Sequence, residues 1–109
     1  MVEEVTPEQV KEKLDEGAIQ IVDIRPPTHF DQGHLPGAIN IPLAELPRRI
    51  DEVEWADDIV VACPIGQSSI QAARLIESYE EITDDTRVAS MQGGYEAWEY
   101  DLERSEAEA

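Results

Sequence analysis

A nearly continuous apolar run of strand length, residues 58–63 (DIVVAC), constrains the fold of this chain more than any other feature. A run of this kind is typical of a central strand that is covered on both faces. Residues 68–79 (SSIQAARLIESY) follow after a short loop, begin with a serine cap and place apolar side chains at helical spacing. The pattern therefore predicts a strand, a tight loop and a helix in direct succession.

Helices and strands alternate along the rest of the chain. Thr6, Pro7 and Gln9 form a capping box that predicts a helix ending at Gly17. The other expected elements are a strand over 18–24, a loop over 28–43 with a short extended piece at 38–41, a partly helical segment over 43–53 interrupted near Pro47, a weaker strand over 87–91 and a final helix over 95–102. This alternation predicts an α/β sandwich with a mostly parallel sheet.

The length of 109 residues is sufficient for one hydrophobic core and too short for two. We therefore expect a single domain over residues 1–103. Residues 104–109 form an acidic tail, which we expect to fray.

The sequence is strongly acidic, because 25 Asp and Glu residues oppose 8 Lys and Arg residues and the formal net charge is −17. A field of this sign repels phosphate backbones and anionic lipid head groups, which disfavours binding to nucleic acid or to a membrane surface. Only Lys11 and Lys13 are lysines, and an acidic, lysine-poor surface resembles that of proteins from salt-loving archaea. We expect stability to rise with molar KCl, because salt screens the self-repulsion.

The first ten residues (MVEEVTPEQV) have neither the basic start nor the apolar core of a signal peptide. No apolar run approaches the roughly 18 residues that a membrane-spanning helix needs. We therefore expect a cytoplasmic protein.

Cys63 is the only cysteine, and it stands at the carboxyl end of the expected central strand. Ligands bind beyond such strand ends in open α/β sheets, and a loop with Gly66 before a helix would turn main-chain N–H groups toward the thiol and favour the thiolate. The alternative is that Cys63 is a small buried core residue. One cysteine allows no internal disulfide, and two histidines without matching spacing give no convincing metal site.

Three segments in succession resemble the rhodanese family of sulfurtransferases: IVDIRPPTHFDQGHLPGAINIP at 21–42, IVVACPIGQSSIQAARLI at 59–76 and QGGYEAW at 92–98. The length and the Cys-x-x-Gly-x-Ser-Ser loop are most similar to the small single-domain thiosulfate sulfurtransferases. The resemblance implies a parallel five-stranded sheet flanked by helices, with Cys63 as the nucleophile that carries a sulfane sulfur as a persulfide.

The resemblance also implies the surroundings of that sulfur, and it implies no cofactor. Main-chain N–H groups from Ile65 to Ser69 would stabilise the persulfide anion, with two serine hydroxyls as auxiliary donors. The donor would be thiosulfate or a protein persulfide, and the acceptor a thioredoxin-like dithiol or another sulfur-acceptor protein. The implied substrate-binding residues are Pro64, Ile65, Gly66, Gln67, Ser68 and Ser69.

The loop departs from the family pattern in its charge. Many members carry an arginine there, whereas positions 64–69 hold no cation, and Pro64 removes one N–H. We therefore expect weak binding of the thiosulfate dianion at low salt.

Five further residues are expected to support the site without reacting. Asp23 and Arg25 are interpreted as a buried tie between loops, and His34 as a loop anchor. Gly93 and Gly94 are expected to form a turn that allows close approach to the cysteine loop. Trp98 is expected in the core.

Two other functions are consistent with parts of the pattern. Cysteine phosphatases and arsenate reductases use a similar loop, but they need an arginine that closes it, and Ser69 stands at that place. A non-catalytic binding or regulatory module of the same family is the stronger alternative. A sulfur carrier that serves enzymes of cofactor or tRNA sulfuration would overlap with the transferase hypothesis.

Overall fold

The computed structural model describes residues 2–17 and 19–104. Its centre is a five-stranded sheet in the order β1-β5-β4-β2-β3, with every neighbouring pair parallel. The expected α/β class with a parallel five-stranded sheet is thus confirmed. The strands are β1 (Glu3–Val5), β2 (Gln20–Asp23), β3 (Ile39–Asn40), β4 (Asp58–Ala62) and β5 (Arg87–Met91).

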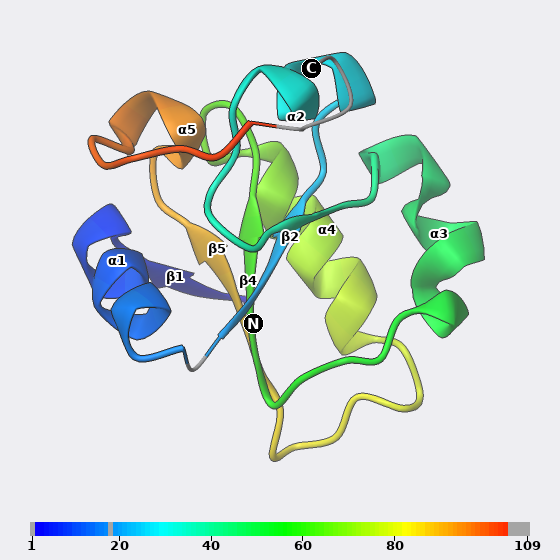
Figure 1. Ribbon diagram of the computed structural model, residues 1–109. Coiled ribbons are helices and arrows are strands. Elements are labelled where there is room, and N and C mark those ends of the chain that lie inside the picture. The colour runs from blue at the N-terminus through cyan, green and yellow to red at the C-terminus, as the bar shows by residue number, and fades with distance from the viewer. Residues whose placement is uncertain (1, 18, 105–109) are drawn as a thin grey trace.

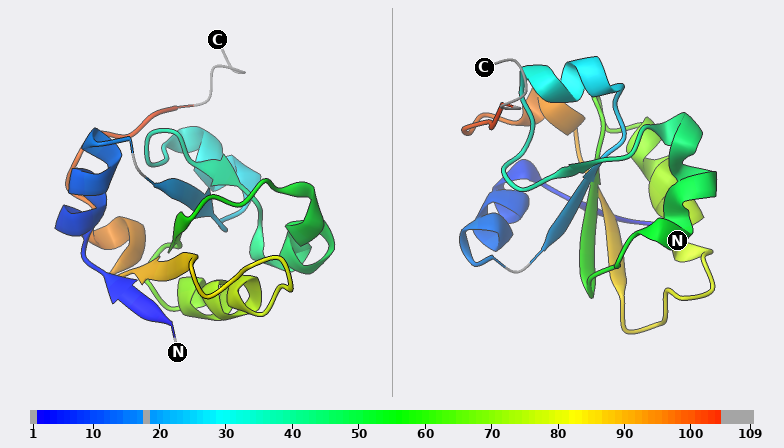
Figure 2. Two further views of the ribbon diagram at one scale, coloured as in Figure 1. Left: turned by 90° about the horizontal axis from the view of Figure 1, so that it is seen from below. Right: turned by 45° about the vertical axis from the view of Figure 1, so that its right-hand side comes forward.

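Helices cover both faces of the sheet, as Figure 1 and the two views of Figure 2 show. One face carries α1 and α5, and the other carries α3 and α4. A further helix, α2, lies across the end of the sheet at which β2 and β4 finish. The bounds are α1 (Pro7–Asp15), α2 (Pro27–Gln32), α3 (Leu46–Arg49), α4 (Ser68–Glu77) and α5 (Gly94–Ala97).

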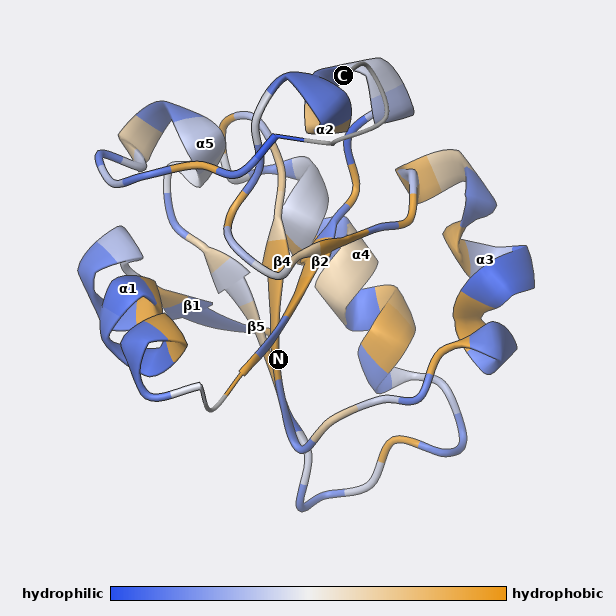
Figure 3. Cartoon of the chain, in the orientation of Figure 1, coloured by the Kyte–Doolittle hydropathy of each residue, from blue (hydrophilic) through white to orange (hydrophobic). Residues whose placement is uncertain are grey.

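Strand β4 is the central strand that its apolar run predicts, since it lies between β5 and β2. Ile59 and Val61 belong to the core under α3 and α4, together with Cys63. Val60 and Ala62 belong to the core on the opposite face. Alternate side chains therefore enter two different cores, which explains why the run is continuously apolar. Figure 3 shows the result as a β4 that is mainly hydrophobic, whereas the edge strand β1 is mainly hydrophilic.

The capping box at the start of α1 is present as predicted. The main-chain N–H of Gln9 donates to Thr6 Oγ1 at 3.2 Å, and the main-chain N–H of Thr6 donates to Gln9 Oε1 at 2.9 Å. Gly17 follows the helix with φ of +69°.

Three expectations about the middle of the chain need correction. The expected loop over 28–43 contains α2, which Pro27 opens because its ring fixes φ near the helical value. For the same reason Pro47 lies in the first turn of α3 and does not interrupt a helix; 3₁₀ turns at Leu43–Glu45 and Ile50–Glu52 flank α3. Strand β2 is shorter than expected and ends at Asp23, and the expected strand start at residue 18 lies outside the described residues.

Both ends of the described chain also differ from expectation. Strand β1 has no counterpart among the expected elements, because two of its three residues are exposed glutamates at the sheet edge. Helix α5 ends at Ala97, well short of residue 102, since Trp98 leaves the helical conformation and enters the core, where it is 8% exposed. Of the expected frayed tail, residues 105–109 lie outside the described residues.

Candidate functional site

Cys63 follows β4 directly and is fully buried, and the loop from Pro64 to Gln67 returns the chain to the start of α4. Within this loop the side chains differ in exposure. Gly66 is buried beneath the turn, whereas Ile65 and Gln67 are exposed. The sulfur therefore lies at the bottom of a short loop whose outer residues face solvent.

Three hydrogen-bonding groups converge on Cys63 Sγ. The main-chain N–H of Gly66 donates to it at 3.0 Å and that of Ser69 at 3.3 Å. The Ser69 hydroxyl lies 3.2 Å from the same sulfur. Main-chain N–H donors around a buried sulfur stabilise its anionic form, because each N–H dipole is aimed at the charge, and a hydroxyl that turns its hydrogen toward the sulfur adds to this effect.

The sulfur also replaces the serine cap that the sequence suggests for α4. Ser68 is the first residue of the helix, and the N-cap position is Gln67, which makes no side-chain cap. The N–H of Ser69, in the first turn, is bound by Cys63 Sγ instead. The orphan donor at this helix start is thus aimed at the nucleophile. Within the described residues, the N–H groups of Ile65, Gln67 and Ser68 make no hydrogen bond to Sγ.

Ser90 is a site residue that the sequence reasoning missed. Its hydroxyl lies 2.6 Å from that of Ser69, and both side chains are fully buried. In the parallel register of β5 with β4, Ser90 lies opposite Val61, two residues before Cys63. A polar residue within a strand that packs into the core was the available signal.

Gly93 and Gly94 pack directly against the cysteine loop. A Cβ added to Gly94 would overlap the carbonyl oxygen of Cys63 and come within 2.7 Å of the main-chain nitrogens of Ile65 and Gly66. Gly94 also has φ of +57°, which favours glycine. Only glycine at position 94 allows the main chain to approach the cysteine loop so closely.

Helix α5 fixes the loop from behind with two main-chain hydrogen bonds. The N–H of Tyr95 donates to the carbonyl of Cys63 at 2.9 Å, and the N–H of Glu96 donates to the carbonyl of Pro64 at 3.0 Å. These two carbonyls are therefore occupied, which leaves the N–H side of the loop to face the sulfur.

Asp23 and Arg25 form a buried ion pair at the end of β2. Asp23 is fully buried, and the guanidinium of Arg25 reaches both of its carboxylate oxygens at 2.8–3.1 Å. Arg25 also donates to the carbonyl of Gly33 at 2.7 Å. The pair therefore ties the end of β2 to the loop after α2. Because Asp23 lies in register with Ala62, the tie is next to the strand end that carries Cys63.

Tyr95 joins this ion pair and is a second residue that the sequence reasoning missed. Its hydroxyl donates to Asp23 Oδ2 at 2.8 Å and accepts from the main-chain N–H of Leu35 at 3.0 Å. The guanidinium carbon of Arg25 lies 3.6 Å from the centre of its ring. Burial, and then the negative charge of Asp23, raise the pKa of Tyr95 well above its ordinary value.

His34 anchors the segment that follows α2. Its Nδ1–H donates to the carbonyl of Phe30 at 2.8 Å, and its ring stacks on the Phe30 ring with centroids 3.7 Å apart. The main chains of His34 and Glu103 exchange two hydrogen bonds of 2.8 Å. With both its ring and its backbone occupied in this way, His34 holds neighbouring segments together.

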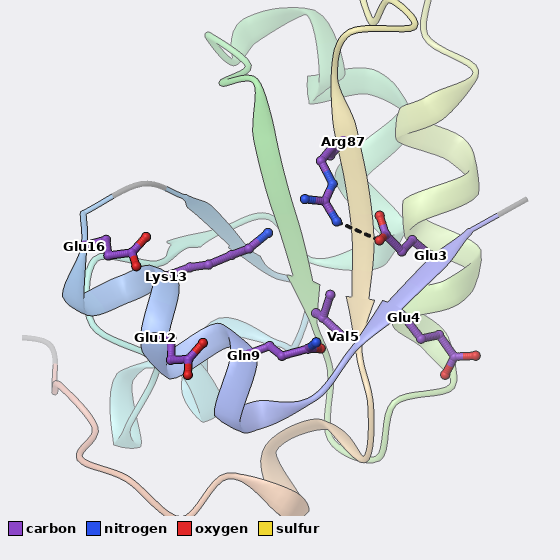
Figure 4. Close-up of a pocket in the computed structure, with 8 residues that line it drawn as sticks. All are labelled: Glu3, Glu4, Val5, Gln9, Glu12, Lys13, Glu16 and Arg87. Carbon is purple, nitrogen blue, oxygen red and sulfur yellow. Dashed lines mark hydrogen bonds and ion pairs between the residues drawn. The ribbon is translucent and has the colours of Figure 1, made fainter.

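A cavity of about 350 Å³ lies elsewhere, between β1, α1 and the start of β5 (Figure 4). Its side chains are charged or polar apart from Val5, and the ion pair between Arg87 and Glu3 crosses it. None of the cysteine-loop residues lines it. In residues 2–17 and 19–104, no three His, Cys, Asp or Glu side chains are grouped to hold a metal ion. Over the same residues, no helix is long and apolar enough to cross a bilayer.

Comparison with known proteins shows the family of this chain. A family model described as a rhodanese-like domain matches residues 6–101. A sulfurtransferase of Allochromatium vinosum is 33% identical over 99 residues, which cover 90% of this chain and 89% of that protein. A thiosulfate sulfurtransferase of Pseudoalteromonas translucida is 36% identical over 91 residues, covering 84% and 83%. A putative sulfur carrier protein of Bacillus subtilis is 32% identical over 77 residues, and the chain spans only 42% of its length.

Solved structures agree on the fold. A crystal structure of a rhodanese-related protein from Thermoplasma volcanium superposes with a TM-score of 0.81 at 21% identity, covering 94% of this chain and 99% of that one. The solution structure of a rhodanese-like domain from Anabaena superposes with a TM-score of 0.79 at 26% identity, covering 96% and 81%.

Proposed function

Because the chain belongs to the family of rhodanese-like domains, we propose that it is a sulfurtransferase that moves a sulfane sulfur through a persulfide on Cys63. The observation that carries the proposal is the convergence of two main-chain N–H groups and one hydroxyl on Cys63 Sγ. Relatives that match most of this chain are named sulfurtransferases, which supports the same reaction class.

In the first step the Cys63 thiolate attacks the outer sulfur of the donor. With thiosulfate, a bond forms between Cys63 Sγ and that sulfur, the sulfur–sulfur bond of thiosulfate breaks, and its electron pair leaves with sulfite. With a protein persulfide, the leaving group is the donor's cysteine thiolate. The N–H groups of Gly66 and Ser69 stabilise the attacking thiolate.

In the second step an acceptor thiolate attacks the outer sulfur of the Cys63 persulfide. A new sulfur–sulfur bond forms on the acceptor, the bond to Sγ breaks, and the electron pair returns to Cys63 as a thiolate. With a dithiol such as a thioredoxin-like protein, the second thiolate then displaces the sulfur as hydrosulfide and leaves a disulfide on the acceptor. Cys63 ends in its starting state, so the cycle is closed.

The charge of the loop favours a protein persulfide over thiosulfate as the donor. Positions 64–69 carry no cation, and the net charge of −17 repels a dianion at low salt. Arg25, beyond the loop, is already neutralised by Asp23. A neutral or weakly charged cysteine persulfide on a partner protein meets no such penalty.

We propose that the protein works in a reducing cytoplasm that is rich in salt. A reducing cytoplasm keeps an unpaired thiol free for sulfur exchange, and the chain has only one cysteine. The excess of acidic residues supports a cytoplasm rich in salt, where self-repulsion is screened.

Intact mass spectrometry tests the proposal directly. The wild type and Cys63→Ser are incubated in molar KCl with thiosulfate or with a protein persulfide donor, and then with a dithiol. We expect the wild type to gain one sulfur atom and to lose it to the dithiol, while Cys63→Ser never gains it. If the wild type gains no sulfur from either donor, the transferase proposal fails and a non-catalytic binding module is the remaining function.

A further inference from the structure

Two fully buried serines form a chain of hydroxyls behind the cysteine. Ser69 Oγ lies 3.2 Å from Cys63 Sγ, and Ser90 Oγ lies 2.6 Å from Ser69 Oγ. Ser90 does not touch the sulfur. In residues 2–17 and 19–104, the contact with Ser69 is the only hydrogen bond that the Ser90 hydroxyl makes.

The protonation state of Cys63 determines whether every S–H and O–H hydrogen of Cys63, Ser69 and Ser90 has a hydrogen-bond acceptor. When Cys63 is a thiol, its S–H donates to Ser69 Oγ, and the Ser69 hydroxyl donates to Ser90 Oγ. The hydrogen of Ser90 is then left without an acceptor among the described residues. A buried hydroxyl hydrogen without an acceptor costs free energy.

When the thiol proton has left to water, an electron pair remains on Sγ and the chain reverses. The Ser69 hydroxyl turns to donate to the sulfur anion, and the Ser90 hydroxyl turns to donate to Ser69 Oγ. No proton moves between the serines, since only the two O–H bonds rotate. Every hydroxyl hydrogen in the chain then has an acceptor, so the arrangement is better satisfied with the anion than with the thiol.

We propose that Ser90 is a positioning residue that orients the Ser69 hydroxyl toward Cys63 and thereby stabilises the thiolate. As a role in sulfur transfer, this inference rests on the proposed function. There the thiolate appears twice, as the attacking group when sulfur is loaded and as the leaving group when sulfur is passed on.

The position of Ser90 favours this role over simple packing. Its side chain is on the same face of β5 as that of Val88, which is 3% exposed and belongs to the apolar core under α4. An alanine would fill such a position without burying a polar group. The hydroxyl is therefore explained by its one partner, Ser69.

The test is the pH dependence of Cys63 alkylation by iodoacetamide, measured with the full chain in molar KCl. Only the thiolate reacts, so the midpoint of the rate profile reports how strongly the anion is stabilised. We expect Ser90→Ala to move this midpoint upward by about half a unit to one unit, a threefold to tenfold loss of thiolate at fixed pH below the midpoint. An unchanged midpoint in the folded variant would overturn the proposal.

A double-mutant comparison separates positioning from a general effect. If Ser90 acts through Ser69, Ser90→Ala produces no further shift in a Ser69→Ala background. An equal shift in both backgrounds would contradict the proposal. Ser78→Ala is the matched control, because this exposed serine lies at the far end of α4 and does not contact the sulfur; its midpoint is expected to stay at the wild-type value.

The pair Ser90→Thr and Ser90→Val repeats the test with two side chains of nearly equal shape, should Ser90→Ala fold poorly. Threonine keeps the hydroxyl and is expected to keep a lower midpoint than valine, and equal midpoints would overturn the proposal. The alkylation profile needs no sulfur transfer. If the wild type never acquires sulfur but Ser90→Ala shifts the midpoint, the proposed function has failed and the positioning role on the thiol stands.

Discussion

Tyr95 forms hydrogen bonds to Cys63 through its main chain and to Asp23 of the buried ion pair through its side chain. Its N–H donates to the carbonyl oxygen of Cys63 at 2.9 Å, and its hydroxyl donates to Asp23 Oδ2 at 2.8 Å. One residue of α5 thus connects the ends of β4 and β2. The position of the nucleophile is therefore tied to a charged cluster that does not touch the sulfur.

Gly94→Ala is expected to displace the cysteine loop and destabilise the fold. The new Cβ would overlap the carbonyl oxygen of Cys63, and backbone atoms can move away only by shifting the loop. The matched control is Gly37→Ala, where φ is also positive at +78° but nothing lies within 4 Å of the added Cβ. We expect a loss of about 1–2 kcal/mol for the control, from backbone strain alone. For Gly94→Ala we expect about 2 kcal/mol more, measured by urea unfolding. Equal losses would show that the close approach does not matter.

Tyr95→Phe is expected to destabilise the protein by about 1–3 kcal/mol at neutral pH. The change keeps the ring beneath Arg25 and removes only the hydroxyl, which leaves the fully buried Asp23 with one donor fewer and the N–H of Leu35 without its acceptor. The measurement is the free energy of unfolding in urea. Tyr100→Phe is the control, since Tyr100 is 37% exposed and its hydroxyl makes no hydrogen bond within residues 2–17 and 19–104. A loss for Tyr100→Phe as large as that for Tyr95→Phe would contradict the assigned role.

The difference in the free energy of unfolding between the wild type and Tyr95→Phe is expected to shrink above about pH 10, the ordinary pKa of a tyrosine. Burial and Asp23 raise the pKa of Tyr95 in the folded protein, so the folded state keeps the phenolic proton when the unfolded chain has lost it. The stabilisation is therefore complete below the unfolded pKa and declines as the pH rises beyond it. Unfolding free energies of wild type and Tyr95→Phe, compared from pH 8 to 11, check the sign. A difference in unfolding free energy that widens with pH would contradict the expected sign.

Much of the chain around the nucleophile could be predicted from local patterns. The apolar run before Cys63, the glycine in its loop and the apolar spacing of α4 are short-range signals, and they correctly placed a strand, a loop and a helix. The capping box of α1 is equally local. Such features need no knowledge of which segments meet in space.

The residues that complete the site could not be found in this way. Ser90 and Tyr95 reach it only because β5 pairs with β4 and α5 turns back over the loop, at sequence separations of 27 and 32 residues from Cys63. Tyr95 belongs to no spacing pattern that distinguishes it from its neighbours, and the one local signal of Ser90, a polar residue within a buried strand, does not show which residue it contacts. Helix α2 differs from expectation for a related reason, since the two prolines that indicate the end of a strand also begin a helix.

Gln67→Arg is expected to lower the KM for thiosulfate about fivefold to tenfold at low salt, if the transfer proposal holds. Gln67 is exposed in the loop, which has no cation to meet a dianion. Ser78→Arg, at the opposite end of α4, adds the same charge away from the loop and is expected to leave KM nearly unchanged. The gain is also expected to decrease in molar KCl, because an exposed charge is screened. Equal effects of the two substitutions would indicate a change in overall field only.

The melting temperature is expected to rise by about 5 °C or more between low salt and molar KCl, which corresponds to roughly 1 kcal/mol for a domain of this size. The net charge of −17 opposes compaction, and the screening length falls from about 10 Å at 0.1 M to about 3 Å at 1 M salt. Figure 4 shows part of the acidic surface, where Glu4, Glu12 and Glu16 line one cavity, and among the described residues they form no ion pair.

Replacing these three glutamates by glutamine removes three negative charges without changing the core, so the triple variant is expected to be more stable at low salt and to gain less from KCl. Salt effects on apolar burial would act on both proteins alike. Calorimetric melting curves of the two proteins over a KCl series separate the causes. If the melting temperatures of both proteins rise equally with KCl, the charges of these three glutamates do not determine the response to salt.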